Sequence, residues 1–389
     1  MKRDYYFLFT IKPSRIYLER FNLKKLGKKF HLKIIYIKNP KKIKYCNLIS
    51  KNLKLKKAIK FSSLAKKSKK IYLSVIANFE SDKLEIYNHC RAYENIKLVD
   101  FYMYNYSYTQ TSKHFYEVLK QNLVNNIFTN INFIIFSILK IILLYFKNII
   151  LKKKKDIKLD YLFYSGSYIK KKINFENIRF NYNIPSFDSL KLTSLKKITL
   201  PKKKFILFQD EMLINHIDLK LLKEKAPEDF DYYNKLNSFF SFLEKKLNFD
   251  VVIALHPRSN LKKSKKLFNN RKCKINLTAE LVKKSEFVCM HASTSSISFP
   301  ILLKKKILIL NSNNIMKNFN YRFRFEIIKK YINLRNINLD NYNNYENDLR
   351  LFINTKIKHK QYINYRNKFL GPLNSKNLNF SDICLSKLI

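Results

Sequence analysis

Short apolar runs alternate with basic, helix-compatible stretches along most of the chain. In the first part, the runs cover residues 5–10, 32–37, 71–77 and 96–101. A second series follows a break near residues 150–160 and covers residues 161–164, 205–208, 251–255, 287–290 and 307–310. Runs that are apolar on both faces and separated by helical segments are typical of buried strands in a parallel sheet. The pattern therefore predicts two parallel sheets, each covered by helices.

Two such sheets predict an α/β chain with two Rossmann-like domains. A chain of 389 residues is long enough to give each domain a core of its own. We expect an N-terminal domain over residues 1–130, a linker over 131–155, a C-terminal nucleotide-binding domain over 156–315 and a tail over 316–389. The tail has no obvious strand, and its Asn-rich joints predict a helical C-terminal tail that packs back across both domains.

Residues 131–155, INFIIFSILKIILLYFKNIILKKKK, form the most apolar segment of the chain. As a helix, the part before the final lysines would be about 31 Å long, which is enough to span a bilayer. Lys140 lies near its middle, and Lys147 lies on the same helical face, which favours a helix in the membrane interface instead. The run Lys152–Lys155 would add attraction to anionic lipid. A buried interdomain helix and a true span remain alternatives.

Basic residues outnumber acidic ones, because 78 Lys and Arg against 28 Asp and Glu give a formal net charge of +50. Such a charge is typical of proteins that bind nucleic acid or an anionic membrane surface. The lysines run from Lys2 to Lys387 without gathering on a nucleic-acid motif, and the excess of Lys, Asn, Ile, Phe and Tyr is what A- and T-rich codons produce. We therefore expect no specific nucleic acid partner.

The cysteines and the first residues bear on the compartment. The five cysteines form no CxxC pair, which argues against a disulfide scaffold and a zinc finger and favours a reducing compartment; they are Cys46, Cys90, Cys273, Cys289 and Cys384. The opening MKRDYYFLFTI lacks the cleavage site of a signal peptide. We expect a cytoplasmic protein, peripheral at the inner face of the cell membrane if residues 131–155 bind lipid.

The strongest local motif is VVIALHPRSN, residues 251–260, in which an apolar strand ends at His256 and Pro257. Pro257 keeps the preceding residue extended, so His256 should stand in a turn at the carboxyl edge of the sheet, where ligands of open parallel sheets bind. The His256 imidazole can hydrogen-bond or protonate a phosphate, and the Arg258 guanidinium can bind the same type of oxygen. The alternative is a histidine that only fills the turn.

A second motif is EFVCMHASTSSISF, residues 286–299, in which another buried-type strand runs into His291 and four hydroxyl residues. These are Ser293, Thr294, Ser295 and Ser296. If a helix begins here, the hydroxyls and the first backbone amides form an anion site, whereas the alternative is that they only cap the helix. Pro300 predicts that this helix is short or starts late. With His256, the motif predicts two phosphate-binding edges on neighbouring strands.

The third motif is FILFQDEMLINH, residues 205–216, in which a strand delivers Gln209, Asp210 and Glu211 to its carboxyl end. A carboxylate within hydrogen-bond reach of a hydroxyl, with a pKa raised by partial burial, can act as a general base. Asp210 is the first candidate for this role and Glu211 the second. The alternative is a solvated acidic turn.

Several other chemistries lack their motifs. The chain has no glycine-rich phosphate loop, no HExxH zinc site and no GxSxG elbow, which disfavours P-loop enzymes, zinc metalloproteases and serine hydrolases. No DxD motif stands at a suitable strand end. We therefore expect neither a metal nor a cofactor.

The order of the three motifs resembles a known group of enzymes. A strand ending in an acidic motif, then one ending in HP, then one running into a serine-rich turn is similar to the bacterial sialyltransferase and polysialyltransferase families of GT-B glycosyltransferases. The wider pattern YYNKLNSFFSFLEKKLNFDVVIALHPRSN, followed by TAELVKKSEFVCMHASTSSISF and KKKILIL, resembles proteins encoded with surface-polysaccharide genes. The resemblance runs from Phe205 to Leu310 and implies a GT-B-like arrangement of the two domains.

In those families the acidic motif supplies the base, the HP histidine meets the donor phosphate, and the serine-rich turn binds that phosphate. The resemblance implies these roles for Asp210 or Glu211, for His256, and for Ser293–Ser296. Met212 stands where the families have a glycine. The implied activity is transfer of a sugar, such as sialic acid or a related acidic sugar, from a nucleotide donor, CMP-linked in first place, to a glycan or lipid-linked glycan.

Two other functions stay open. A polyol-phosphate transferase of similar fold would use a histidine and a phosphate site in the same way. A non-catalytic polysaccharide-assembly protein would keep the fold without the reaction. Gln209 and His291 are further candidates for the site, and Arg258 joins the donor phosphate-binding residues. The basic residues would attract a nucleotide sugar and an acidic acceptor to the cleft between the domains.

Overall fold

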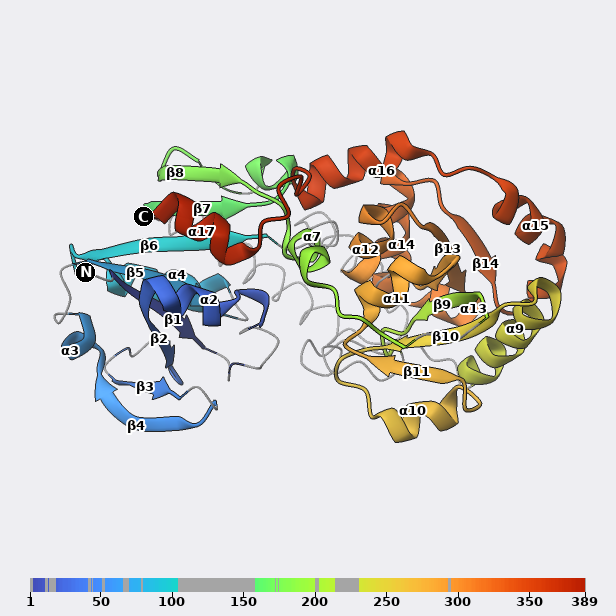
Figure 1. Ribbon diagram of the computed structural model, residues 1–389, viewed down its shortest axis with the longest axis horizontal. Coiled ribbons are helices and arrows are strands. Elements are labelled where there is room, and N and C mark those ends of the chain that lie inside the picture. The colour runs from blue at the N-terminus through green and yellow to red at the C-terminus, as the bar shows by residue number, and fades with distance from the viewer. Residues whose placement is uncertain are drawn as a thin grey trace, which may run out of the picture. The chain divides into compact units, whose positions relative to one another are not determined.

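The computed structural model of the chain contains two units, each built on its own β-sheet (Figure 1). Of the described residues, the first unit takes those up to 103, 158–193 and 371–388, and the second takes 194–370. The structure describes residues 3–10, 13, 19–40, 43, 45–50, 53–65, 70–77, 80–103, 158–171, 173, 175–199, 203–213, 231–292 and 295–388.

The sheet of the second unit has six strands, and all of its pairings are parallel. The strands are β9 (Phe205–Gln209), β10 (Asp250–Leu255), β11 (Lys272–Ile275), β12 (Phe287–Met290), β13 (Lys306–Asn311) and β14 (Arg335–Asn338). Their order is β11-β10-β9-β12-β13-β14. The chain builds outward from β9 through β10 to β11 and then returns to the other side of β9 with β12. This is the strand order of a Rossmann fold, which binds ligands at the point where the direction reverses.

Helices connect these strands and follow the last one. They are α9 (Tyr232–Leu247), α10 (Leu261–Leu267), α11 (Thr278–Lys284), α12 (Ser298–Leu302), α13 (Asn313–Lys317), α14 (Phe319–Tyr331), α15 (Glu346–Asn354) and α16 (His359–Tyr365). In α9, Leu236, Phe240 and Leu243 are buried, and their spacing of four and three residues places them on one helical face. The Phe240 ring lies 5.1 Å from the Phe208 ring of β9, so this face packs against the centre of the sheet.

The sheet of the first unit has eight strands in the order β4-β3-β2-β1-β5-β6-β7-β8. They are β1 (Arg3–Phe9), β2 (Phe30–Tyr36), β3 (Tyr45–Ile49), β4 (Leu55–Lys60), β5 (Ile71–Ile76), β6 (Ile96–Tyr102), β7 (Leu159–Tyr164) and β8 (Ile178–Asn183). The neighbouring strands β2, β1, β5, β6, β7 and β8 pair in parallel, and β3 and β4 extend the sheet beyond β2 as an antiparallel hairpin. The helices of this unit are α2 (Leu23–Lys29), α3 (Phe61–Ala65), α4 (Glu80–Cys90), α7 (Phe187–Lys191) and α17 (Phe380–Leu388).

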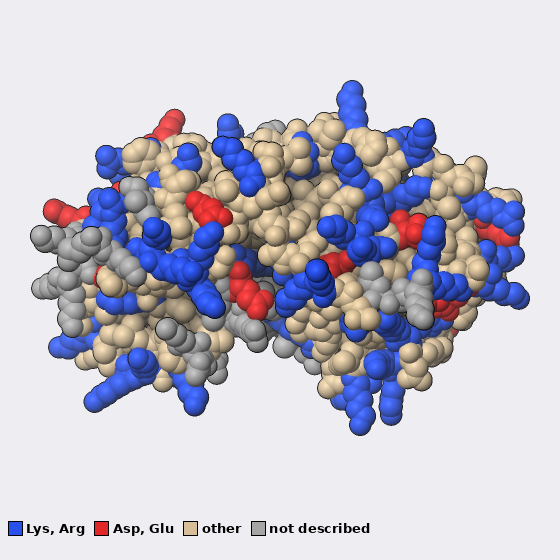
Figure 2. All heavy atoms as spheres, viewed as in Figure 1, with Lys and Arg blue, Asp and Glu red and all other residues tan. Residues whose placement is uncertain are grey.

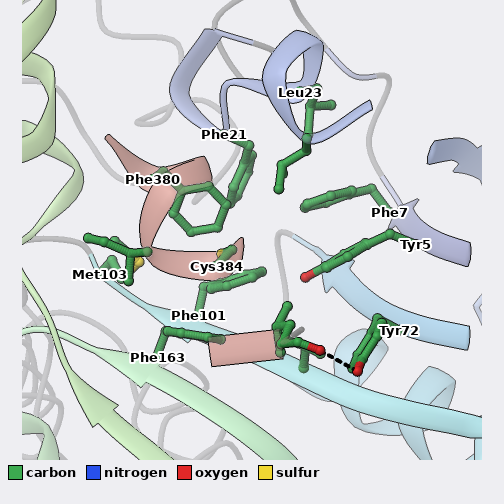
Figure 3. Close-up of a cluster of buried hydrophobic side chains, with 14 of the residues drawn as sticks. Tyr5, Phe7, Phe21, Leu23, Tyr72, Phe101, Met103, Phe163, Phe380 and Cys384 are labelled. Carbon is green, nitrogen blue, oxygen red and sulfur yellow. Dashed lines mark hydrogen bonds between the residues drawn. The ribbon is translucent and has the colours of Figure 1, made fainter. Parts of the chain in front are cut away.

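Helix α17 completes the core of the first unit, although it is encoded more than 180 residues after β8 ends. It lies beside β6 and β7 (Figure 1) and buries Phe380, Ile383 and Leu388 in a cluster of aromatic side chains from the sheet (Figure 3). The Phe380 ring lies 5.0 Å from the Phe101 ring. The Tyr72 hydroxyl donates a hydrogen bond of 2.5 Å to the backbone carbonyl of Leu388. Helix α17, at the end of the described residues, thus covers one face of this sheet.

The prediction of an α/β chain with two Rossmann-like domains is confirmed by the two mainly parallel sheets. One strand was assigned to the wrong sheet: residues 161–164 were placed in the second series, but β7 pairs in parallel with β6 of the first unit. The pairing hydrogen bonds and not the sequence gap of 104–157 decide where this strand belongs. The prediction of a strand-free tail is also wrong, because β14 pairs with β13. Residues 371–388 belong to the first unit, and a tail packed across both domains stays a prediction.

The predicted apolar segment at residues 131–155 lies outside the described residues. Among the residues that the structure describes, no helix is long and apolar enough to cross a membrane. Contact of the protein with a membrane surface therefore stays a prediction.

Candidate active site

Asp210 follows β9 directly and is buried in the second unit, with 8% of its surface exposed. Its carboxylate accepts hydrogen bonds from the backbone N–H groups of Met212, at 3.0 Å, and of His256. Burial raises the pKa of Asp210 to about 6, and the two backbone hydrogen bonds only partly oppose this shift. Near neutral pH the group is therefore an ionised carboxylate with an unusually high proton affinity, which is what a general base requires.

Residues 256–259 form a turn at the carboxyl end of β10, beside Asp210. The backbone N–H of Ser259 donates to the His256 carbonyl at 2.9 Å, and the backbone N–H of Arg258 donates to His256 Nδ1 at 3.2 Å. Because a backbone N–H can only donate, Nδ1 accepts, and the proton of the neutral imidazole lies on Nε2. The ring is half-buried, so its Nε2–H is positioned by the turn as a hydrogen-bond donor.

Gln209 and Ser296 connect the two strands that flank the point of reversal. Ser296 lies in a short 3-10 helix (Ser295–Ile297) after β12, and its hydroxyl donates to Gln209 Oε1 at 2.9 Å. Gln209 is 1% exposed, and its Nε2 has no hydrogen-bond partner among the described residues. Ser259 Oγ, in the turn after β10, likewise has no such partner. Each unmatched buried group costs about 1 to 3 kcal/mol, so this edge of the sheet carries a stability cost.

Met212 adopts a left-handed backbone conformation, with φ of 54°. This conformation favours glycine, because a Cβ atom meets the backbone there. Its N–H is the group that donates to Asp210, so the unusual backbone places an amide on the carboxylate. Met212 thus adopts a backbone geometry that glycine favours, at the position where the resemblance implied a glycine.

His291 is fully buried and lies after β12, where its ring joins two other elements. Its Nδ1 lies 2.7 Å from the Leu310 carbonyl, and its Nε2 lies 2.7 Å from the Tyr232 hydroxyl. The carbonyl can only accept, so Nδ1 carries the proton and Nε2 accepts from Tyr232. Burial lowers the pKa of His291 to about 4, which keeps the ring neutral. His291 therefore links the end of β12 to β13, through the Leu310 carbonyl, and to α9, through Tyr232.

Tyr321, in α14, secures the next residue of the same turn. Its hydroxyl accepts from the backbone N–H of Ala292 at 3.2 Å and lies 2.8 Å from Asn311 Oδ1. The charge of Glu211 raises the pKa of Tyr321 further, after the larger effect of burial, so Glu211 lies near this hydroxyl. Sequence reasoning missed Tyr232 and Tyr321, because nothing in the motifs distinguishes them among 26 tyrosines.

The structure thus brings most of the predicted site residues to one edge of the second sheet. Gln209, Asp210 and His256 lie there together, and Ser296 joins them through its hydrogen bond to Gln209. Arg258 is exposed in the same turn, and Glu211 is buried next to Asp210. The predicted residues Ser293 and Thr294 lie outside the described residues, and for Ser295 only the backbone is described. Helix α12 is short, as Pro300 predicted, and no side chain caps it.

No protein-family model and no curated protein sequence matches this chain. Solved structures that are similar include the glycotransferase of kitacinnamycin, with 8% identity, full coverage of both chains and a TM-score of 0.46. MurG of Acinetobacter baumannii has 5% identity, 99% coverage of both chains and a TM-score of 0.44. The calicheamicin glycosyltransferase CalG4 has 8% identity, covers 99% of this chain and 98% of its own, and has a TM-score of 0.46. These likenesses are too distant to assign an activity or residue roles to this chain.

The chemistry of the edge follows from its own groups. It offers a buried carboxylate with a raised pKa, an imidazole N–H, a serine hydroxyl and an exposed guanidinium. A carboxylate can take a proton from a hydroxyl, while the imidazole N–H and the guanidinium cation can bind an anion such as phosphate. The edge can therefore combine proton abstraction with anion binding at the point of strand reversal.

Proposed function

We propose that this chain is a GT-B glycosyltransferase that binds a nucleotide sugar at the carboxyl edge of its second sheet. The observation that carries the proposal is Asp210, a buried carboxylate with a pKa of about 6 held by the backbone of the His256 turn. A buried charge without a cation is costly, and such groups occur mostly where proton transfer needs them. The Rossmann strand order supports a nucleotide as the ligand at this edge.

In the proposed reaction, Asp210 takes the proton of the acceptor hydroxyl as the oxygen attacks the anomeric carbon of the donor sugar. The bond between that carbon and the phosphate oxygen breaks, and the nucleotide leaves with the bonding electrons. His256 donates its Nε2–H to the departing phosphate, Arg258 binds another of its oxygens, and Ser296 donates to a third once its hydroxyl has left Gln209 Oε1. The remaining residues of the serine-rich turn, Ser293–Ser295, complete this phosphate site.

The finer assignments rest on the motif resemblance. We propose a CMP-linked donor of sialic acid or a related acidic sugar, a surface glycan or lipid-linked glycan as acceptor, and a reaction that needs no metal. The net charge of +50 supports anionic substrates. Residues 131–155 would hold the protein peripherally at the inner face of the cell membrane, since their lysine run attracts anionic lipid.

A thermal-shift panel with CMP, CDP, UDP and GDP tests the donor class. A nucleotide at about 100 times its Kd should stabilise the protein by about 2.7 kcal/mol. We expect the largest shift with CMP. A largest shift with CDP would point to the polyol-phosphate transferase, and no shift with any of the four would contradict a nucleotide site.

Asp210→Asn and Glu211→Gln form a matched pair that tests the base. Loss of Asp210 should slow turnover about 10²-fold or more, while nucleotide affinity persists and Glu211→Gln stays near wild type. Normal turnover in D210N with loss in E211Q would move the role to Glu211. Normal turnover in both variants would remove the acidic motif from the mechanism.

Ser296→Ala and Ser285→Ala test the phosphate site. Ser285 precedes β12 at its opposite end, and its hydroxyl donates to the Val282 carbonyl. Only S296A should weaken nucleotide binding, by about tenfold, as expected for one hydrogen bond to a charged group. Equal affinities of the two variants in titration calorimetry would leave Ser296 as a structural link to Gln209.

A further inference from the structure

A hollow of about 250 Å³ opens in the second unit, over residues that the candidate active site does not use. Four lysines line it, two from the segment before β9, Lys196 and Lys197, and two from β11, Lys272 and Lys274. Residues two apart on a strand share a face, so Lys272 and Lys274 point to the same side of the sheet. Val252 of β10, the register partner of Lys272, lines the same hollow.

The abundance of lysine does not by itself single out this hollow, because Lys and Arg cover much of the visible face of the molecule (Figure 2). Its lysines differ in their partners. Elsewhere in the unit, Lys235 pairs with Asp340 and Lys246 pairs with Glu346, both at 2.8 Å. Within the described residues, none of the four lysines of the hollow has a carboxylate within ion-pair distance, and no acidic residue lines it. An anion that enters the hollow would therefore offset the like charges of these lysines.

The wall of the hollow is fixed by a buried carboxylate. Glu280 of α11 is 3% exposed, and its Oε1 accepts the backbone N–H of Lys196 at 3.1 Å. This bond ties the segment before β9 to α11, whose Leu281 also lines the hollow. The backbone that carries Lys196 is thus held beside α11 by this hydrogen bond.

The size and the floor of the hollow indicate what fits. Its volume lies below the roughly 300 to 1,000 Å³ of sites that enclose a drug-sized ligand, so a whole nucleotide sugar is too large. The floor is aliphatic, from Ile198, Val252 and Leu281, which a bare inorganic anion would not contact. A single sugar ring that carries an oxyanion would place its C–H face on this floor and its charge among the lysines.

We propose that this hollow is a second binding site, distinct from the candidate active site, for a sugar unit that bears a carboxylate or a phosphate. Such a unit occurs in an acidic glycan and in a free sugar phosphate. The hollow opens to the surface, so a longer chain can continue out of it. The site shares no residue with the candidate active site, and its existence does not depend on glycosyl transfer.

Titration calorimetry of the full chain at low salt tests this proposal with three probes. A hyaluronan hexasaccharide carries carboxylates, chitohexaose is a neutral chain of the same length, and glucose 6-phosphate is a single charged sugar. We expect saturable one-to-one binding of at least one charged probe and none of chitohexaose. The tighter of the two charged probes identifies the source of the sugar unit.

A matched pair of double variants locates the site. K272Q/K274Q removes two charges from the hollow, and K262Q/K266Q removes two exposed charges from α10 in the same unit. The first should weaken the charged probe about tenfold or more, since two charge-assisted contacts are lost, and the second only about twofold. Thermal melts of both variants should match the wild type.

Three results would overturn the proposal. Equal weakening by both double variants would show general attraction by the charged surface. Absence of binding by both charged probes, or equal binding of chitohexaose, would remove the site. Tighter binding of a single-stranded DNA oligomer through Lys272 and Lys274 would replace the sugar by a nucleic acid. None of these readouts involves turnover, so they separate this site from the proposed function.

Discussion

Each unit has a buried aspartate on or next to an interior strand of its sheet: Asp100 lies in β6, and Asp210 directly follows β9. The two carboxylates differ in the groups that contact them. Asp100 is paired with Lys83, whose Nζ lies 2.5 Å from its Oδ1. The only groups that the structure shows on the Asp210 carboxylate are backbone N–H groups, and its pKa is raised to about 6. The first unit therefore pairs its buried Asp100 with a cation, while Asp210 has no cation partner among the residues that the structure describes.

The difference extends to the rest of each core. In the first unit, the space above the sheet is filled by aromatic and aliphatic side chains and closed by α17. In the second unit, Gln209, Asp210 and Glu211 are all buried at the carboxyl edge of the sheet. The first arrangement stabilises its unit, whereas the second costs stability, as active sites commonly do.

The largest expected effect is on the closure of the first unit by α17. Phe380→Ala should destabilise the first unit by about 3 to 5 kcal/mol. The substitution removes a ring that contacts the rings of Phe21 and Phe101, and it leaves a cavity in the core. Hydrogen exchange should show faster opening of β1 and β6, with β9 and β10 unchanged. The control Ser386→Ala, exposed on the same helix, should change nothing. Equal loss of protection in both sheets would contradict separate cores.

The two aspartates should respond oppositely to the same substitution. Asp100→Asn breaks a buried ion pair and leaves Lys83 unpaired, which should cost about 3 to 5 kcal/mol. Asp210→Asn removes a buried charge without a cation and should stabilise the protein by about 3 kcal/mol at pH 8. Urea unfolding at pH 8 measures both changes. If D210N destabilised the protein as much as D100N does, the inference that Asp210 costs stability and Asp100 provides it would be contradicted.

The stabilisation by Asp210→Asn should depend on pH. The pKa of Asp210 is raised above its unfolded value, so its contribution is most favourable below pH 3.8 and is lost as the pH rises to about 6. The difference between D210N and wild type should therefore grow over this window and level off above it. A difference that is constant from pH 4 to pH 8 would show that Asp210 has an ordinary pKa.

His291 should show the reverse dependence. Its pKa is lowered to about 4, so the folded protein resists protonation that the unfolded chain accepts below pH 6.5. Stability from this residue is present above pH 6.5 and is lost, by about 3 kcal/mol, as the pH falls to 4. His291→Gln should remove this loss and flatten the acid side of the stability curve relative to wild type. If H291Q and the wild type showed the same dependence of unfolding free energy on pH between pH 6.5 and pH 4, the lowered pKa of His291 would be contradicted.

The smallest effect is expected at Tyr321. Tyr321→Phe removes the hydroxyl that accepts from Ala292 and should cost about 1 kcal/mol of stability. Because it loosens the turn that leads to Ser296, it should also raise the KM for the donor while kcat changes less. Tyr362→Phe is the control, since that buried hydroxyl donates to the Lys305 carbonyl away from the edge. Equal KM values in the two variants would limit Tyr321 to a packing role.

The strands that the sequence predicted are those that lie inside the sheets. β9, β10, β12 and β13 are buried on both faces, so their residues form continuous apolar runs. The strands at the four sheet edges, β4, β8, β11 and β14, were all missed, and so was the interior strand β3, which is only partly buried. Their sequences, LKKAIK, IRFNYN, KCKI and RNIN, carry basic and amide side chains, as is common for edges that must not pair further.

The sequence predicted those site residues that lie at the ends of buried, apolar strands. Gln209, Asp210 and His256 follow apolar strands directly, and the parallel sheet brings their ends together. Tyr232 and Tyr321, which hydrogen-bond to His291 and Ala292 after β12, were not predictable. They lie on helices α9 and α14, and only the tertiary packing brings them to this edge of the sheet. The sequence also did not show that His291 is buried, which lowers its pKa to about 4.

The use of residues 371–388 in the first unit sets an order of events during synthesis. The ribosome makes residues 194–370, which contain the whole six-stranded sheet, before it makes α17. Domains generally fold as units while the chain is being made, so the second unit can form its core while the first still exposes the aromatic face that α17 covers. During this interval the exposed face of the earlier sheet is a surface for chaperones to bind and for neighbouring nascent chains to aggregate on.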